Sequence, residues 1–144
     1  MTQEEMIAAL EEVQAQQAAA RLISEYALAV DSRDVDRFMA IWHPEAIWVI
    51  GGDTVVDGLD AIRAVAETLW STYSETHHWF ANPSFTVAGE TMHGECTTNA
   101  TLQEVAGTTY RAAATYVDEY AKSEGRWLIY RRATTITFWA PMAS

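Results

Sequence analysis

The sequence TTYRAAATYVDEYAKSEGRWLIYRRATTITFW, residues 108–139, contains two β-rich runs, 108–121 and 126–139, with a glycine between them. β-Branched and aromatic residues favour strands, and a glycine-containing break between two such runs is typical of a hairpin. Two similar runs precede this pair, at 76–87 and 91–104. The four runs predict an antiparallel meander in the C-terminal half of the chain.

The N-terminal part of the chain has a helical pattern instead. Thr2 and Glu5 match a capping box, and the alanine-, glutamate- and glutamine-rich sequence that follows favours one long helix, ending at 31–34. A short second helix is expected over 35–42, and a third, with apolar residues at helical spacing, over 58–73.

Two short strands, 46–50 and 54–56, are expected on either side of a Gly-Gly-Asp turn. Helices followed by a run of strands indicate the α+β class. We therefore expect a single domain over 1–144, in which a curved antiparallel sheet packs against the long N-terminal helix and two shorter helices. Such a sheet encloses a cone, and its wide end is a natural ligand pocket.

Composition narrows the possible partners. The 144 residues include 20 Asp and Glu against 9 Lys and Arg, for a net charge of −11. This charge repels phosphate backbones and anionic lipids, so neither nucleic acid nor a membrane is an expected partner. No apolar run approaches the roughly 18 residues of a membrane-spanning helix. The single cysteine, Cys96, cannot form an internal disulfide and favours a reducing cytoplasm.

Asp31 and His78 form the first candidate site. Asp31 follows the apolar stretch at the end of the long helix, and His78 enters the first long strand. A carboxylate beside an imidazole fixes its tautomer and makes it a stronger base. The alternative is a helix-ending aspartate and a half-buried strand histidine. His77 and His78 must face opposite sides of a strand, and no HxH or HExxH spacing occurs, so we predict no metal.

Further positions could contribute to such a site. Tyr26 lies on the apolar stripe of the helix, where its phenol could protonate a leaving oxygen or simply pack in the core. One of Arg131 and Arg132 must face inward, where it needs a carboxylate or an anionic ligand. The alternative is an ion pair with Asp118 or Glu119. Two tryptophans that could wall an apolar cavity, or belong to the core, are Trp48 and Trp79.

Several short segments, in this order and spacing, resemble the SnoaL-like family of the nuclear transport factor 2-like (scytalone dehydratase-like) superfamily. They are Leu28–Asp31, Ile41–Trp42, Glu75–His78, Thr115–Tyr120 and Gly125–Trp127. The resemblance extends from about residue 18 to Pro141 and implies an α+β cone. It also implies a catalytic His78–Asp31 dyad, with Arg132 and Trp48 in the same site. Dehydrochlorinases of the family carry a lysine five residues before the aspartate, whereas Tyr26 is similar to the tyrosine of bile acid dehydratases.

The resemblance implies a cofactor-independent lyase that removes water, or hydrogen halide, from a hydrophobic cyclic small molecule. His78 would take a proton from carbon, Asp31 would orient it, Tyr26 would assist the departing hydroxyl, and Arg132 would stabilise negative charge. A homo-oligomer, either dimer or trimer, is expected. The alternatives are an isomerase or polyketide-type cyclase on the same scaffold, a non-catalytic small subunit as in ring-hydroxylating dioxygenases, or a ligand-binding module.

Overall fold

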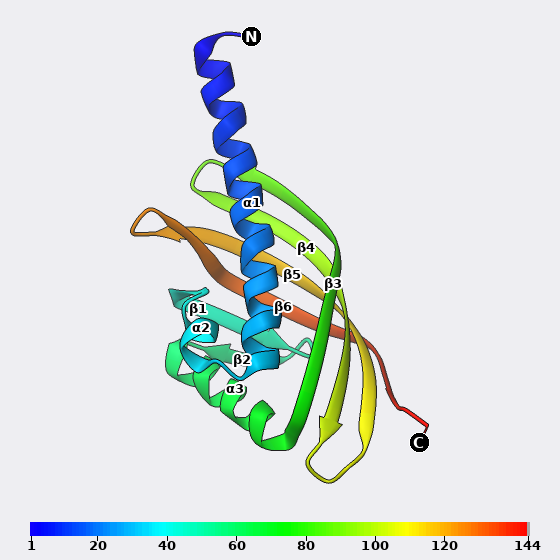
Figure 1. The fold of residues 1–144 in the computed structure, drawn as a ribbon. Helices are drawn as coiled ribbons and strands as arrows, with labels where there is room; N and C mark the ends of the chain where they lie inside the picture. Colours follow the sequence, from blue (N-terminus) through cyan, green and yellow to red (C-terminus); the bar gives the residue numbers. More distant parts are fainter. Residues whose placement is uncertain (144) are drawn as a thin grey trace.

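The computed structural model describes residues 1–143 of the chain (Figure 1). Its elements in chain order are α1 (Gln3–Ser32), α2 (Val35–Met39), β1 (Trp42–Ile50), β2 (Thr54–Asp57), α3 (Leu59–Thr72), β3 (Tyr73–Ala88), β4 (Thr91–Glu104), β5 (Thr109–Ser123) and β6 (Arg126–Pro141). The strands form one strongly curved sheet in the order β2-β1-β6-β5-β4-β3, with α1 crossing its concave face. The α+β cone predicted from the sequence is confirmed.

The sheet is mixed rather than wholly antiparallel. Strands β3 to β6 form the predicted antiparallel meander, and β1 and β2 form the predicted hairpin. Strand β1, however, runs parallel to β6, with Trp48 opposite Arg132. This pairing was not predicted, because alternation along a strand shows which face is buried but does not identify a distant partner strand.

Helix α1 supplies two of the candidate residues near its C-terminal end. Thr2 and Glu5 form the predicted capping box, and Arg33 ends the helix in the left-handed conformation, with φ 57°. The N-terminal half of α1 extends beyond the sheet and is exposed up to Gln14 (Figure 1). Its C-terminal half packs on the sheet through small and apolar residues, and this packing directs Tyr26 into the core.

The second helix is shorter than expected. We expected a helix over 35–42 and a strand from 46, but α2 ends at Met39 and β1 already begins at Trp42. The side chain of Trp42 is buried against the rings of Phe38 and Trp48, and its backbone pairs with β6. Tertiary packing therefore overrides the local helical pattern here. No described helix has both the length and the apolar character needed to cross a bilayer.

Cross-strand register decides which side chains face α1. Residues directly opposite one another on neighbouring strands share a face of the sheet. One such row joins Trp48, Arg132 and Asp118, all of them buried. The concave face therefore carries a buried charged pair beneath α1.

Candidate active site

Asp31 and His78 meet where the last turn of α1 reaches the first residues of β3. His78 Nδ1 lies 2.6 Å from Asp31 Oδ1, and the His78 backbone N–H donates to Oδ2 at 2.8 Å. The Thr76 hydroxyl also donates to Oδ1, at 2.9 Å. The imidazole side chain is 6% exposed and the carboxylate side chain 23%. The two predicted residues are therefore in direct contact at the edge of the interior.

The environment keeps the Asp31 carboxylate ionised. Partial burial raises the pKa of Asp31, but the hydrogen bonds from the His78 ring, the His78 backbone and Thr76 outweigh it, so the pKa lies below its ordinary value. An ionised acceptor at Nδ1 favours the tautomer with hydrogen on Nδ1. In the neutral imidazole, Nε2 then carries the free lone pair.

Tyr26 lies at the centre of an aromatic cluster beside the dyad. Its ring meets the His78 ring edge-on, with centroids 6.2 Å apart. Four more rings lie within 6.0 Å of it, those of Phe38, Trp48, Phe80 and Tyr116. Burial raises the pKa of Tyr26, although the Arg132 cation opposes the change, so the phenol stays protonated. These rings fill the interior next to His78.

Arg132 is fully buried and paired with Asp118. Its Nε and Nη2 donate to the two carboxylate oxygens at 2.9 and 2.8 Å, and the Tyr120 hydroxyl donates to Oδ2 at 2.8 Å. Burial by itself lowers the pKa of Arg132, but the Asp118 carboxylate more than offsets it, so the guanidinium stays charged. The carboxylate partner considered from the sequence is thus Asp118, inside the cone rather than on its surface.

The guanidinium of Arg132 also lies between two phenol rings. Its Cζ is 4.5 Å from the centroid of Tyr26 and 4.4 Å from that of Tyr116. A cation over the face of an aromatic ring is attracted by the ring's quadrupole, most strongly where water is excluded. The Tyr26 ring therefore contacts both the imidazole of His78 and the guanidinium of Arg132.

The two tryptophans considered as pocket walls lie on opposite faces of the sheet. Trp48 is buried beside Tyr26 and donates from Nε1 to the Thr134 hydroxyl at 2.9 Å. Trp79 is 61% exposed, because it follows His78 directly on β3 and alternation directs it to the outer face. Trp79 therefore does not line the interior, contrary to expectation.

Tyr116 and the inward position of Asp118 were missed by the sequence reasoning. Both lie on β5, where Tyr116, Asp118 and Tyr120 alternate onto the concave face. This period-two spacing is visible in the sequence. A strand register was needed to show that Asp118 faces Arg132.

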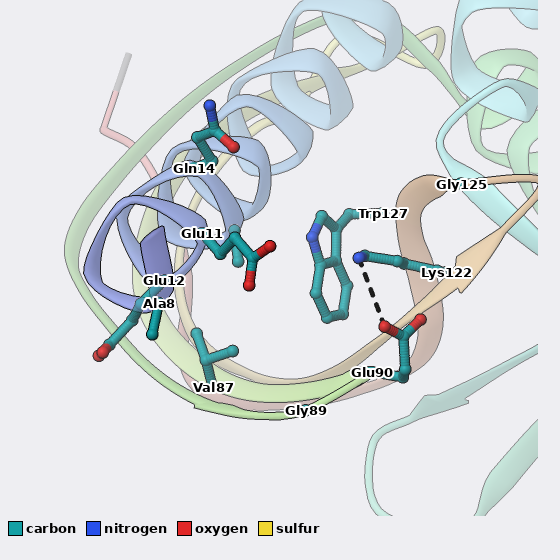
Figure 2. Close-up of a pocket in the computed structure, with 11 residues that line it drawn as sticks. Ala8, Glu11, Glu12, Gln14, Val87, Gly89, Glu90, Lys122, Gly125 and Trp127 are labelled. Atoms are coloured by element: carbon teal, nitrogen blue, oxygen red, sulfur yellow. Dashed lines mark ion pairs between the residues drawn. The ribbon is translucent and has the colours of Figure 1, made fainter. Parts of the chain in front are cut away.

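A separate groove of about 540 Å³ lies between the exposed half of α1 and two hairpin turns (Figure 2). Lys122 Nζ lies 3.6 Å from Glu90 and 5.2 Å from the centre of the Trp127 ring, and Glu11 and Glu12 line the opposite side. None of the candidate residues lines this groove. Over residues 1–143, no three His, Cys, Asp or Glu side chains gather as a metal site would require.

The curved six-stranded sheet with α1 across its concave face is a fold that this chain shares with solved relatives. The sequence profile of the SnoaL-like domain matches residues 11–133, and the chain belongs to this family. Hexachlorocyclohexane dehydrochlorinase 1 of Sphingobium indicum is 27% identical over 125 residues, which are 85% of this chain and 81% of that protein. The gamma-hexachlorocyclohexane dehydrochlorinase of the same species is also 27% identical, over 80% of its length.

Solved structures agree with this family membership. A type 2 hexachlorocyclohexane dehydrochlorinase superposes with a TM-score of 0.88 at 25% identity, covering 94% of each chain. An NTF2-like protein with a cystatin-like fold from Novosphingobium aromaticivorans has a TM-score of 0.77 at 19% identity, covering 94% of this chain and 90% of that one. The second similarity shows the fold alone.

Proposed function

We propose that the protein is a lyase that eliminates water, or hydrogen halide, from a hydrophobic cyclic small molecule. The contact between His78 Nδ1 and Asp31 Oδ1 is the observation that carries the proposal, because it leaves Nε2 as a base beside an apolar interior. The similarity to hexachlorocyclohexane dehydrochlorinases supports the same class of chemistry.

In the proposed reaction, Nε2 of His78 takes a proton from a ring carbon. Asp31 orients the imidazole and stabilises the imidazolium that forms. Tyr26, protonated and buried beside His78, assists the departing hydroxyl, and Arg132 stabilises the negative charge that develops. The elimination is redox-neutral, so the reaction as proposed consumes no cofactor. We also expect the enzyme to act as a homo-oligomer, dimer or trimer, in the cytoplasm.

The test is turnover of a panel of ring alcohols, hydroxy ketones and ring halides, followed by mass spectrometry. We expect loss of water or hydrogen halide that requires both His78 and Asp31. His77→Gln is the matched control for His78→Gln, because His77 is the adjacent histidine, with a side chain that is 63% exposed on the outer face. Equal elimination by wild type and by the His78→Gln/Asp31→Asn double variant would overturn the proposal.

An isomerase is the second candidate, because the same base can move a proton without any loss of a leaving group. The cation beside Tyr26 could stabilise an enolate in that reaction as well. The mass of the product separates the two candidates, since isomerisation leaves it unchanged. Recovery of every compound unaltered would instead favour a non-catalytic binding module.

A further inference from the structure

A second groove, of about 340 Å³, lies along the flank of α1. The other sides of this groove are formed by α2, by the segment that joins α2 to β1, and by the start of β6. None of the candidate catalytic residues lines it. Its apolar lining consists of Ala18, Leu22, Ala40, Ile41, Trp127 and Leu128. The groove is therefore a site separate from the interior of the cone.

The charge of this groove is opposite to that of the whole chain. Of the nine Lys and Arg residues in the chain, three line the groove, together with a single acid. They are Arg21, Arg37 and Arg126, against Glu25. The groove in Figure 2, which Trp127 also lines, contains three glutamates and one lysine instead. A surplus of two positive charges is thus concentrated in one place on a chain whose net charge is −11.

Most of the arginine N–H groups in the groove are free. Glu25 accepts from Arg37 Nε at 2.5 Å and from Nη2 at 2.8 Å, whereas Nη1 makes no hydrogen bond within residues 1–143. Over the same residues, neither Arg21 nor Arg126 forms an ion pair or a side-chain hydrogen bond. The hydrogen bond from Arg37 lowers the pKa of Glu25, and the Arg37 and Arg21 cations add to the effect. One carboxylate is therefore shared between two cations, and the third cation has no counter-ion.

Charge and shape indicate what such a groove can bind. A guanidinium presents a planar fork of N–H donors that matches the oxygens of a phosphate or a carboxylate. A phosphate monoester carries about −1.5 to −2 at pH 7 and so matches the surplus of two positive charges, which a carboxylate only half neutralises. The apolar lining, including half-buried Trp127, suits an apolar group attached to the phosphate. A volume near the lower end of the range for ligand pockets, roughly 300–1,000 Å³, points to a small molecule.

We propose that this groove binds a small organic phosphate monoester. The three guanidinium groups hold the phosphate, and the apolar part of the ligand lies against Trp127 and Leu128. Such a ligand connects α1, α2 and β6, which are distant in sequence, so its binding stabilises the folded chain. The site does not depend on the elimination proposed above.

The test compares four small probes by isothermal titration calorimetry in a buffer without phosphate. The probes are phenyl phosphate, inorganic phosphate, benzoate and phenol. We expect phenyl phosphate to bind about tenfold or more tightly than benzoate and phenol, because only phenyl phosphate combines two negative charges with an apolar ring. Inorganic phosphate should bind less tightly than phenyl phosphate, since it lacks the apolar contact. Phenyl phosphate should also raise the melting temperature of the protein.

Variants assign the binding to this groove. Arg21→Gln and Arg126→Gln each remove one positive charge without breaking an ion pair, and we expect the double variant to bind phenyl phosphate about tenfold more weakly. Arg63→Gln is the matched control, because Arg63 is exposed on α3 and does not line the groove. Glu25→Gln removes the acid from the groove, so we expect it to tighten the binding of phenyl phosphate several-fold. Damage to the fold would not produce that gain.

Two results would overturn the proposal. One is wild-type protein that binds phenyl phosphate no more tightly than benzoate or phenol. The other is a double variant, Arg21→Gln with Arg126→Gln, that loses no more affinity than Arg63→Gln. Neither result bears on elimination by His78, which has its own test.

Discussion

His78 and Asp31 are 47 residues apart in sequence, yet two atoms of each take part in their contact. The imidazole Nδ1 and the backbone N–H of His78 engage different oxygens of the same carboxylate. A single contact would let the carboxylate rotate, whereas two contacts fix its plane relative to the ring. Asp31 therefore holds the imidazole in one orientation and one tautomer.

The dyad should behave as one catalytic unit. We expect His78→Gln and Asp31→Asn each to lower kcat by about 10²–10⁴-fold on a substrate that the enzyme accepts. Because each residue acts through the other, the double variant should be little worse than the more impaired single variant. Steady-state kinetics of the three variants measures this. If the loss of kcat in the double variant instead equals the product of the two single losses, the two residues act independently.

The lowered pKa of Asp31 predicts a specific acid sensitivity. A carboxylate with a folded pKa below its unfolded value adds stability above the unfolded value, near pH 4, and this contribution is lost as the pH falls through the folded pKa. The difference in unfolding free energy between wild type and Asp31→Asn should therefore shrink below about pH 4. Urea titrations at a series of pH values measure it. Asp53→Asn, at an exposed turn, controls for the loss of one charge, and a difference that stays constant with pH would contradict the prediction.

The Arg132–Asp118 pair should show strong coupling in a double-mutant cycle. Asp118→Leu leaves a buried guanidinium without its counter-ion, so we expect it to cost about 3–5 kcal/mol of stability. Replacing both residues, as Arg132→Met with Asp118→Leu, removes both charges and should cost much less than the sum of the single changes. Chemical denaturation of the four proteins gives the coupling energy, and additive costs would argue against the pair.

The two tryptophans should differ sharply in their contribution to stability. Trp48→Ala removes a buried ring and its hydrogen bond to Thr134, and we expect a loss of about 3–5 kcal/mol. Trp79→Ala removes a largely exposed ring from the outer face, and we expect a change within about 0.5 kcal/mol in the monomer. Urea midpoints of both variants test this. A large loss at Trp79 that depends on protein concentration would reveal an interface between copies.

Cys96 should be unreactive in the folded protein. Burial raises the pKa of its thiol to about 11, so little thiolate is present at pH 8. We expect slow reaction with Ellman's reagent in buffer and fast reaction after unfolding in guanidinium chloride. Rapid labelling of the native protein would show that the strand around Cys96 opens readily.

Local patterns in the sequence predict most of the fold. The capping box at Thr2, the end of the first helix at 31–34, and the glycine breaks between strands all depend on a few neighbouring residues. The parallel pairing of β1 with β6 could not be predicted in this way, because the two strands are far apart in the chain. The early start of β1 at Trp42 also depends on packing against distant residues.

The sequence by itself identified the candidate residues for the proposed chemistry. Strand alternation required one of Arg131 and Arg132 to face inward, and the family resemblance selected Arg132. Only the tertiary structure decided which of the candidate residues meet: the curvature of the sheet brings His78 to Asp31, and strand register sets Arg132 against Asp118 and directs Trp79 outward. The physical reason is that backbone preferences and strand alternation act over only a few residues. A site requires packing to bring together residues that are far apart in the chain.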